Sequence, residues 1–270
     1  MAHFKFPLIH PEYALSVLLA IAVGALFPVM QDIRQRRQRR QYVLLQVITL
    51  IGAVAGSKLA VLYGETGWPL APAGNWSNLL FSGRSILGAL IFGLLAAEVA
   101  KPLIGYSLPP NDRFAAVLPF ALAIGRVGCL LQGCCRGVPC TGWCAITYAD
   151  GIPRHPAQIY EMLFDVSMGI LFIWMVKRRL ARGRLFSLFL IAYGLFRFST
   201  EFIRETPKLY QGWLSGYQVM SFLAVLLGAA FFVRYSVARP LSVVCDVQRA
   251  EDTVDRKPVS AANPQSSDHP

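Results

Sequence analysis

The chain has 270 residues, of which 55% are hydrophobic and only 15% are charged, and its net charge is +11. This composition excludes a soluble globular protein, because several apolar runs approach the roughly 20 residues that are needed to cross a bilayer. A strongly positive charge can indicate a nucleic-acid-binding protein. Here the basic residues lie between the apolar runs, where they indicate membrane topology and contact with anionic lipid.

Seven apolar segments are predicted to be transmembrane helices. They cover residues 13–30, 42–63, 84–104, 114–131, 156–175, 185–203 and 217–235. The first segment ends without a small-residue cleavage motif, so we expect a retained helix and not a signal peptide. The chain is therefore predicted to be an all-α polytopic membrane protein. Residues 1–239 would form one transmembrane helical domain, and residues 240–270 a polar, disordered cytoplasmic tail.

The connections between these segments differ in their content of basic residues. Clusters follow the first and the fifth segments: Arg34, Arg36, Arg37, Arg39 and Arg40, and then Lys177, Arg178, Arg179, Arg182 and Arg184. The N-terminus and the connections after the second, fourth and sixth segments are sparser, with Lys5, Arg84, Arg136, Arg154, Arg204 and Lys208. The positive-inside rule then predicts an N-terminus outside and a C-terminus in the cytoplasm, with the long loop after residue 131 facing outward.

The fourth segment ends in a glycine- and cysteine-rich run, GRVGCLLQGCCRG, at residues 125–137. An arginine at bilayer depth costs on the order of 3 kcal/mol or more, so its side chain normally faces protein or a wet cavity. A guanidinium presents a planar fork of donors, which suits a phosphate or a carboxylate. Arg126 is therefore the first candidate for binding an anionic head group. The alternative is an interfacial arginine whose side chain extends to water.

A second intramembrane arginine lies in the sixth segment. Tyr193, Arg197 and Glu201 follow one another at intervals of four residues, so they share one face of a helix. A buried Arg–Glu pair can be purely structural. Alternatively, Arg197 binds an anion and Glu201 orients it, and the presence of Arg126 in the fourth segment favours this interpretation.

The fifth segment carries polar residues on one face as well, namely Gln158, Glu161 and Asp165. Two carboxylates four residues apart in an apolar setting repel each other, so either one is protonated or each has its own arginine. Packing contacts within the helix bundle are the alternative reason for this pattern. Lys58 in the second segment is a further intramembrane cation.

Five of the six cysteines lie close together, at Cys129, Cys134, Cys135, Cys140 and Cys144. The spacing argues against zinc, because no C-x2-C pair is present and adjacent cysteines rarely ligate one ion. We therefore expect no metal. A disulfide within the outward loop and a thiolate nucleophile beside an arginine both stay open.

Three stretches together resemble the prolipoprotein diacylglyceryl transferase family of bacterial inner membranes. They are GRVGCLLQGCCRG at 125–137, RHPAQIYE at 154–161 and YGLFRFSTEFIRE at 193–205. The resemblance implies a multi-pass inner-membrane enzyme that transfers diacylglyceryl from phosphatidylglycerol to the lipobox cysteine of a preprolipoprotein, forming a thioether and releasing glycerol phosphate. The implied partners are phosphatidylglycerol, the preprolipoprotein signal peptide and the bilayer, with no nucleic acid and no cofactor.

The resemblance also implies catalytic residues. The family signature is the arginine of a G-R-x-G run, which binds phosphatidylglycerol in the family and is matched here by Arg126 and Gly128. Arg197 and Glu201 match an essential pair in the family's Y-G-x-x-R-x-x-x-E stretch. The catalytic residues implied for this chain are therefore Arg126, Arg197 and Glu201.

Weaker matches extend the implied lipid-binding set. Tyr13 resembles an early tyrosine of the family, Gly137 ends the matching signature run, and Lys58 stands where an arginine is usual. The residues implied to bind phosphatidylglycerol are Arg126, Arg197, Tyr13, Gly137 and Lys58.

One departure concerns the chemistry. Typical members carry a histidine in an H-G-G-L-I-G run, and this chain has Leu87 at that place. The acceptor thiol must become a thiolate to attack carbon. The base would then be Glu201, which we favour, or Glu161, His155 or the departing phosphate. Leu87 also leaves two alternatives open: a divergent paralogue with another acceptor or no activity, and a lipid-binding or transport protein.

Overall fold

The computed structural model of this chain describes residues 36–66, 83, 85–105, 112–178, 180–210 and 212–237. The chain divides into two compact units, Met1–Phe232 and Val233–Pro270. The first unit contains the functional site. The predicted first segment (residues 13–30) with Tyr13, and the predicted tail (residues 240–270), lie outside the described residues.

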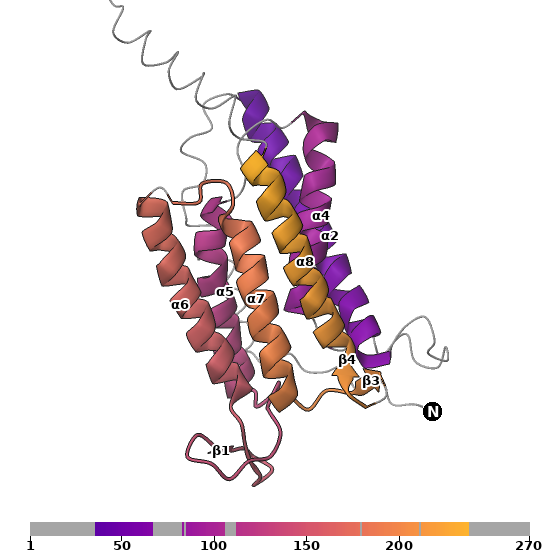
Figure 1. Cartoon of the computed structure of the whole chain (residues 1–270), viewed down its shortest axis with the longest axis vertical. Helices are drawn as coiled ribbons and strands as arrows, with labels where there is room; N and C mark the ends of the chain where they lie inside the picture. The colour runs from indigo at the N-terminus through magenta and orange to yellow at the C-terminus, as the bar shows by residue number, and fades with distance from the viewer. Residues whose placement is uncertain are drawn as a thin grey trace, which may run out of the picture. The chain divides into compact units, whose positions relative to one another are not determined.

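Long helices dominate the described residues (Figure 1). They are α2 (Arg36–Thr66), α4 (Ile86–Ile104), α5 (Asp112–Leu131), α6 (Ala157–Lys177), α7 (Leu185–Thr200) and α8 (Gly216–Val237). In this part of the chain, six helices are long and apolar enough to cross a membrane. The structure is therefore mainly helical and consistent with a polytopic membrane protein. These helices coincide with the second to seventh predicted segments.

The connections contain short strands that an all-α prediction leaves out. In the loop between α5 and α6, β1 (Ile146–Thr147) pairs antiparallel with β2 (Pro153–Arg154). Between α7 and α8, β3 (Lys208–Tyr210) pairs antiparallel with β4 (Leu214–Ser215). A folded connection must satisfy its own backbone N–H and C=O groups, and these two-stranded ladders do so.

Close backbone contact joins α2 to α4. A Cβ atom built at Gly56 would lie 2.2 Å from the Cβ atom of Phe92, and one built at Gly88 would lie 2.3 Å from the Cβ atom of Ala60. Both positions therefore exclude any larger residue unless the helices move apart. Small residues of this kind allow transmembrane helices to pack closely.

The first turn of α4 holds the position at which the resembling family has its histidine. Ser85 caps this helix, and its hydroxyl oxygen accepts a hydrogen bond from the backbone N–H of Gly88 at 3.4 Å. Leu87 is buried, with 2% of its surface exposed. A buried aliphatic side chain cannot accept a proton, so this position supplies no base.

A second group of helices, α5, α6 and α7, is packed together and carries the functional site (Figure 1). Gly169 of α6 lies against the ring of Phe120 of α5, where an added Cβ atom would come within 2.5 Å of the ring. Leu163, Ile170 and Leu195 are exposed on this group, as expected for side chains that face lipid. The polar faces of α6 and α7 are therefore turned toward protein.

The end of α7 differs slightly from the predicted segment 185–203. The α-helix ends at Thr200, and a single 3-10 turn, η2 (Glu201–Ile203), completes the segment. Arg204 then adopts an extended backbone conformation. The chain thus leaves α-helical geometry between Arg197, which lies in α7, and Arg204, which lies beyond the 3-10 turn.

Candidate active site

Glu161 is the centre of the site. Its side chain is completely buried, and three arginines surround its carboxylate. Arg126 of α5 pairs with Oε2. Arg197 of α7 approaches Oε1 with Nη1 at 3.3 Å, and Arg204, just beyond η2, approaches the same oxygen with Nη1 at 2.8 Å. The carboxylate of Glu161 on α6 therefore contacts one arginine of α5 and two from the segment that runs from α7 to just beyond η2.

Glu201 adds a second buried carboxylate. Its Oε2 lies 3.0 Å from Nη2 of Arg197, and its Oε1 accepts a hydrogen bond from the hydroxyl of Ser215 at 3.2 Å. Lys208 donates to the backbone carbonyl of Glu201 at 3.1 Å. The predicted pairing of Arg197 with Glu201 on one helical face is confirmed. We call Arg126, Glu161, Arg197, Glu201 and Arg204 the arginine–glutamate cluster.

The charges in this cluster do not balance. Three guanidiniums face two carboxylates, so the ionised cluster carries one net positive charge. Nε of Arg126 and Nε of Arg204 are buried and have no hydrogen-bond partner among the described residues. An excess cation with unused donors in a low-dielectric setting is suited to bind an anion.

The structure decides between the two alternatives for the carboxyl groups of Glu161 and Asp165 on α6. Gln158, Glu161 and Asp165 are all buried on one face, as predicted. However, no ion pair joins Asp165 to an arginine in the described part of the chain, and neither of its carboxyl oxygens has a hydrogen-bond partner there. The alternative in which each carboxylate has its own arginine is wrong, because Glu161 contacts all three.

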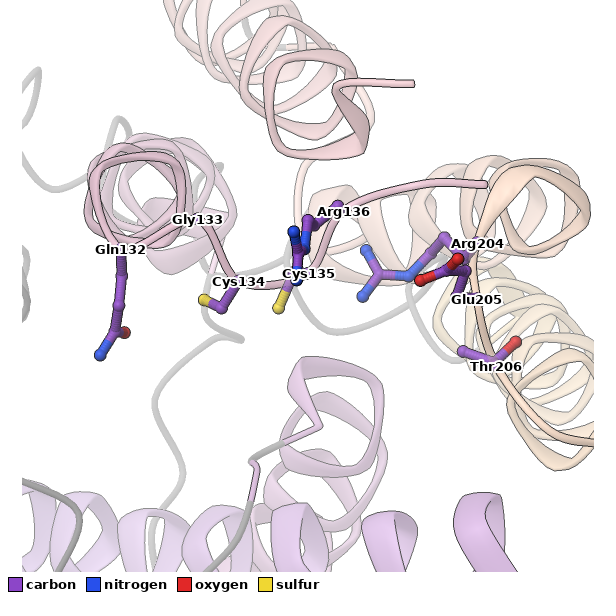
Figure 2. A pocket seen from close by; sticks show the side chains of 8 residues that line it. All are labelled: Gln132, Gly133, Cys134, Cys135, Arg136, Arg204, Glu205 and Thr206. Carbon is purple, nitrogen blue, oxygen red and sulfur yellow. The ribbon is translucent and has the colours of Figure 1, made fainter. Parts of the chain in front are cut away.

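A cavity of about 390 Å³ lies next to this cluster (Figure 2). Its lining consists of Gln132, Gly133, Cys134, Cys135, Arg136, Arg204, Glu205 and Thr206. Arg204 both lines this cavity and donates to Glu161, so it connects the cavity to the buried charges. Neither Arg126 nor Arg197 is among the lining residues.

Arg204 belongs to the site in the structure but is not among the site residues that the sequence predicts. The signal was present, because Arg204 lies seven residues after Arg197 and so faces the same side. What the spacing does not reveal is the partner, Glu161, which lies on another helix.

The loop after α5 is attached to both neighbouring helices of the site. Gly137 donates its N–H to the carbonyl of His155 at 2.9 Å, and Val138 donates to the carbonyl of Ile203 at 2.8 Å. A Cβ atom at Gly137 would lie 2.6 Å from the oxygen of Ile203 and 2.7 Å from Cβ of His155. Close backbone approach therefore explains why residue 137 is a glycine.

Replacing Gly137 with alanine is expected to destabilise the protein by about 1–3 kcal/mol, because the atoms in the way are mostly backbone. The matched control is Gly142→Ala in the same loop, where nothing lies within 4 Å of an added Cβ atom. Thermal unfolding of the detergent-solubilised variants measures the difference. Equal midpoints for the two variants would contradict the close contact at Gly137.

The remaining residues implied for lipid binding lie elsewhere. Lys58 donates from Nζ to the carbonyl oxygen of Gly83 at 3.0 Å. This hydrogen bond links α2 to the segment that leads into α4, and these helices are not the ones that carry the arginine–glutamate cluster. Tyr13 lies outside the described residues.

Three cysteine side chains converge at the end of α5. The sulfur atoms of Cys129, Cys134 and Cys135 all lie within 4.8 Å of one another. The chain turns sharply here, with positive φ angles of 64° at Gly133 and 59° at Cys135. We call these three side chains the thiol cluster. The sequence spacing alone did not predict it, because the turn brings adjacent residues back toward the helix end.

Mutual hydrogen bonding makes these thiols unequal. Hydrogen bonds from Cys129 and Cys134 lower the pKa of the Cys135 thiol below its usual range, and the charges of Arg204 and Arg126 lower it further. Hydrogen bonds with Cys129 and Cys135 raise the pKa of the Cys134 thiol, and burial raises it further. Cys135 is therefore the thiol of this cluster that ionises first.

A cysteine and a histidine also meet in the loop between α5 and α6. Sγ of Cys144 lies 3.9 Å from Nδ1 of His155, and the same nitrogen lies 3.2 Å from the hydroxyl of Tyr160. Residue spacing does not predict this pair, because Cys144 and His155 are eleven residues apart in a loop. The contact arises because the β1–β2 hairpin folds the loop back toward the start of α6.

Comparison with known proteins adds an independent observation. A family model described as prolipoprotein diacylglyceryl transferase matches residues 3–234. A relative from Clostridium perfringens (strain 13 / Type A), named phosphatidylglycerol–prolipoprotein diacylglyceryl transferase 2, is 30% identical over 197 residues, which cover 69% of this chain and 75% of that protein.

Two further relatives carry the name phosphatidylglycerol–prolipoprotein diacylglyceryl transferase. The one from Clostridium tetani (strain Massachusetts / E88) is 28% identical over 224 residues, covering 78% of this chain and 89% of the relative. The one from Bordetella parapertussis (strain 12822 / ATCC BAA-587 / NCTC 13253) is 32% identical over 206 residues, covering 72% of this chain and 77% of the relative.

Proposed function

The chain belongs to the prolipoprotein diacylglyceryl transferase family, and from this premise we propose that it transfers diacylglyceryl from phosphatidylglycerol to a prolipoprotein cysteine. The products are a thioether-linked lipid and glycerol phosphate. One observation carries this proposal: a buried cluster with an excess positive charge adjoins a cavity of about 390 Å³ through Arg204. A phosphodiester head group is an anion of the kind that such a cluster binds.

The arginines of the cluster are proposed to hold the phosphate. Arg204 lines the cavity and would meet the head group first, while Arg126 and Arg197 lie deeper, on α5 and α7. When the carbon–oxygen bond breaks, negative charge develops on the departing phosphate. Fixed guanidiniums stabilise that charge without having to reorganise. Glu161 keeps the guanidiniums together before the lipid binds.

Glu201 is proposed to act mainly by orienting Arg197. Its carboxylate is completely buried and is held by Arg197 and by the hydroxyl of Ser215. It is not among the residues that line the cavity. These contacts favour the orienting role over removal of the thiol proton, the two roles that the sequence left open. Tyr13, Gly137 and Lys58 stay proposed contributors to lipid binding.

We further propose that the described helices are part of a seven-helix arrangement in the inner membrane of a bacterium, with residues 13–30 as the first helix. The N-terminus would lie outside and the C-terminus in the cytoplasm. The support is the basic clusters after the first and fifth predicted segments. With this orientation, the cavity opens toward the outer leaflet.

A reporter that is active only outside the cytoplasm tests this orientation. Fused after Arg136, in the loop that follows α5, it should be active. Fused after Arg182, between α6 and α7, it should be silent because that connection would be cytoplasmic. Activity in the opposite pattern would overturn the orientation and the outer-leaflet position of the cavity.

The activity itself is tested by complementation. In a bacterial strain depleted of its own transferase, expression of this chain should restore lipid modification of prolipoproteins, read from their mobility and mass. Purified chain should also transfer labelled diacylglyceryl from phosphatidylglycerol to a lipobox peptide. Normal membrane expression without either result would contradict the proposal. It would favour the divergent paralogue that Leu87 suggests.

A further inference from the structure

We propose that the thiol cluster, formed by Cys129, Cys134 and Cys135, binds a Zn²⁺ ion and leaves its fourth coordination position open to the cavity. Three convergent sulfur atoms are the basis of this proposal. Three protein ligands with one open position are typical of catalytic zinc, whereas structural zinc has four protein ligands.

The local backbone explains how adjacent cysteines can reach one ion. Cys129 lies in the last turn of α5, and the chain reverses through Gly133, whose φ angle is 64°. Cys135 also has a positive φ angle, 59°, which is uncommon for a residue with a side chain. Cys134 Sγ lies 3.6 Å from the carbonyl oxygen of Cys129. The turn thus directs both later cysteines back toward the helix end.

The distances lie close to those of a zinc site. Zinc–sulfur bonds of about 2.3 Å place the sulfurs of a tetrahedral site about 3.8 Å apart. The three sulfur atoms here are all within 4.8 Å of one another, so their separations differ from that spacing by no more than about 1 Å on the long side. A disulfide would need only two of these sulfurs. It would not account for the convergence of the third.

The arginines near the thiol cluster would compensate the negative charge of the zinc-bound cluster. Three thiolates and one Zn²⁺ carry a net charge of −1. Arg126 and Arg204 belong to a cluster with one net positive charge, and Arg204 lines the same cavity as Cys134 and Cys135. Cys134 and Cys135 line the cavity, so a ligand there can reach the fourth position (Figure 2).

The open position would take the acceptor thiol, an inference that rests on the proposed transferase function. The acceptor S–H releases its proton to solvent in the cavity, and its sulfur bonds to zinc as a thiolate. That sulfur then forms a C–S bond with the glyceryl carbon. The C–O bond breaks with its electron pair passing to the departing phosphate, and zinc releases the thioether. This route forms the thiolate without the histidine that Leu87 replaces.

Metal binding tests the site independently of catalysis. The full chain is purified in detergent with a reductant, incubated with Zn²⁺, freed of excess metal and analysed for its metal content. We expect one zinc ion per chain, and thiolate-to-metal charge-transfer absorption when Co²⁺ is used instead. Cys134→Ser should lose both signals, whereas Cys140→Ser should keep both. Absence of zinc from the reduced parent chain, or equal loss in the two variants, would overturn the site.

A second measurement tests the acceptor role. A lipobox peptide with its cysteine should shift the Co²⁺ spectrum of the parent chain, and the same peptide with serine should not. If cobalt binds but both peptides leave its spectrum unchanged, the role in thiol activation is wrong while the metal site stands. The phosphatidylglycerol transfer assay is scored separately, so failure of the transferase function is distinguished from failure of the metal site.

Discussion

Replacing Arg126 with lysine is expected to slow diacylglyceryl transfer about a hundredfold, nearly as much as replacing it with alanine. Lysine keeps the charge and can still pair with Glu161, the carboxylate that Arg126 contacts. It loses the planar fork, including Nε, which has no hydrogen-bond partner among the described residues and is free for a phosphate oxygen. Loss of one donor to a developing anion costs on the order of 3 kcal/mol.

The measurement is the initial rate of transfer of labelled diacylglyceryl from phosphatidylglycerol to a lipobox peptide, with folding checked by thermal unfolding. Arg178→Lys is the matched control, because Arg178 is exposed at the opposite end of α6 from Glu161. Its rate should equal that of the parent chain. A normal rate for Arg126→Lys would show that Arg126 does not bind the phosphate.

Replacing Glu161 with glutamine is expected to destabilise the protein by about 3–5 kcal/mol. The carboxylate is completely buried, and Arg126, Arg197 and Arg204 all depend on it for charge compensation. Without it, Glu201 is the only carboxylate left within the arginine–glutamate cluster. Removing one partner of a buried ion pair is strongly destabilising because the remaining charges are left uncompensated.

The change in the free energy of unfolding is measured by thermal or denaturant unfolding in detergent. Glu205→Gln is the control, since Glu205 also pairs with an arginine, Arg154, but half of its side chain is exposed. Water solvates the half-exposed carboxylate, and Arg154 keeps a second partner in Asp150 at 3.5 Å, so we expect a loss of about 0–1 kcal/mol. A loss at Glu161 no larger than that at Glu205 would show that Glu161 does not hold the cluster together.

These two experiments separate roles that the geometry assigns to different side chains. Glu161→Gln should lower stability and activity together, because it releases all three arginines. Arg126→Lys should lower activity with a smaller loss of stability, because the ion pair with Glu161 can persist. The ratio of the two effects therefore distinguishes the residue that assembles the site from the residue that contacts the lipid.

Much of the helical structure follows directly from the sequence. Long apolar runs predicted α2, α4, α5, α6, α7 and α8. The pairing of Arg197 with Glu201 was also predictable, because residues four apart on a helix always face the same side. The same periodicity placed Gln158, Glu161 and Asp165 on one buried face. Each of these properties depends only on residues within one helix.

The partners of Glu161 were decided by the tertiary structure. Arg126 lies on another helix, and Arg197 and Arg204 follow Glu161 by 36 and 43 residues. Helix periodicity shows which side of a helix carries a charge, but it does not show which neighbour that side meets. Close contacts such as that of Gly169 with Phe120 set the packing of α5 against α6.

The thiol cluster also depends partly on the sequence and partly on the tertiary structure, in this case within a short stretch of the chain. The sequence determined that cysteines crowd the end of α5, beside an arginine in an apolar helix. Whether their sulfurs converge depends on two positive φ angles, at Gly133 and Cys135, which residue spacing does not specify. Residue types and helical faces are local properties and can be read from the chain. The meeting of side chains across turns and between helices depends on packing, which arises only when the whole fold is formed.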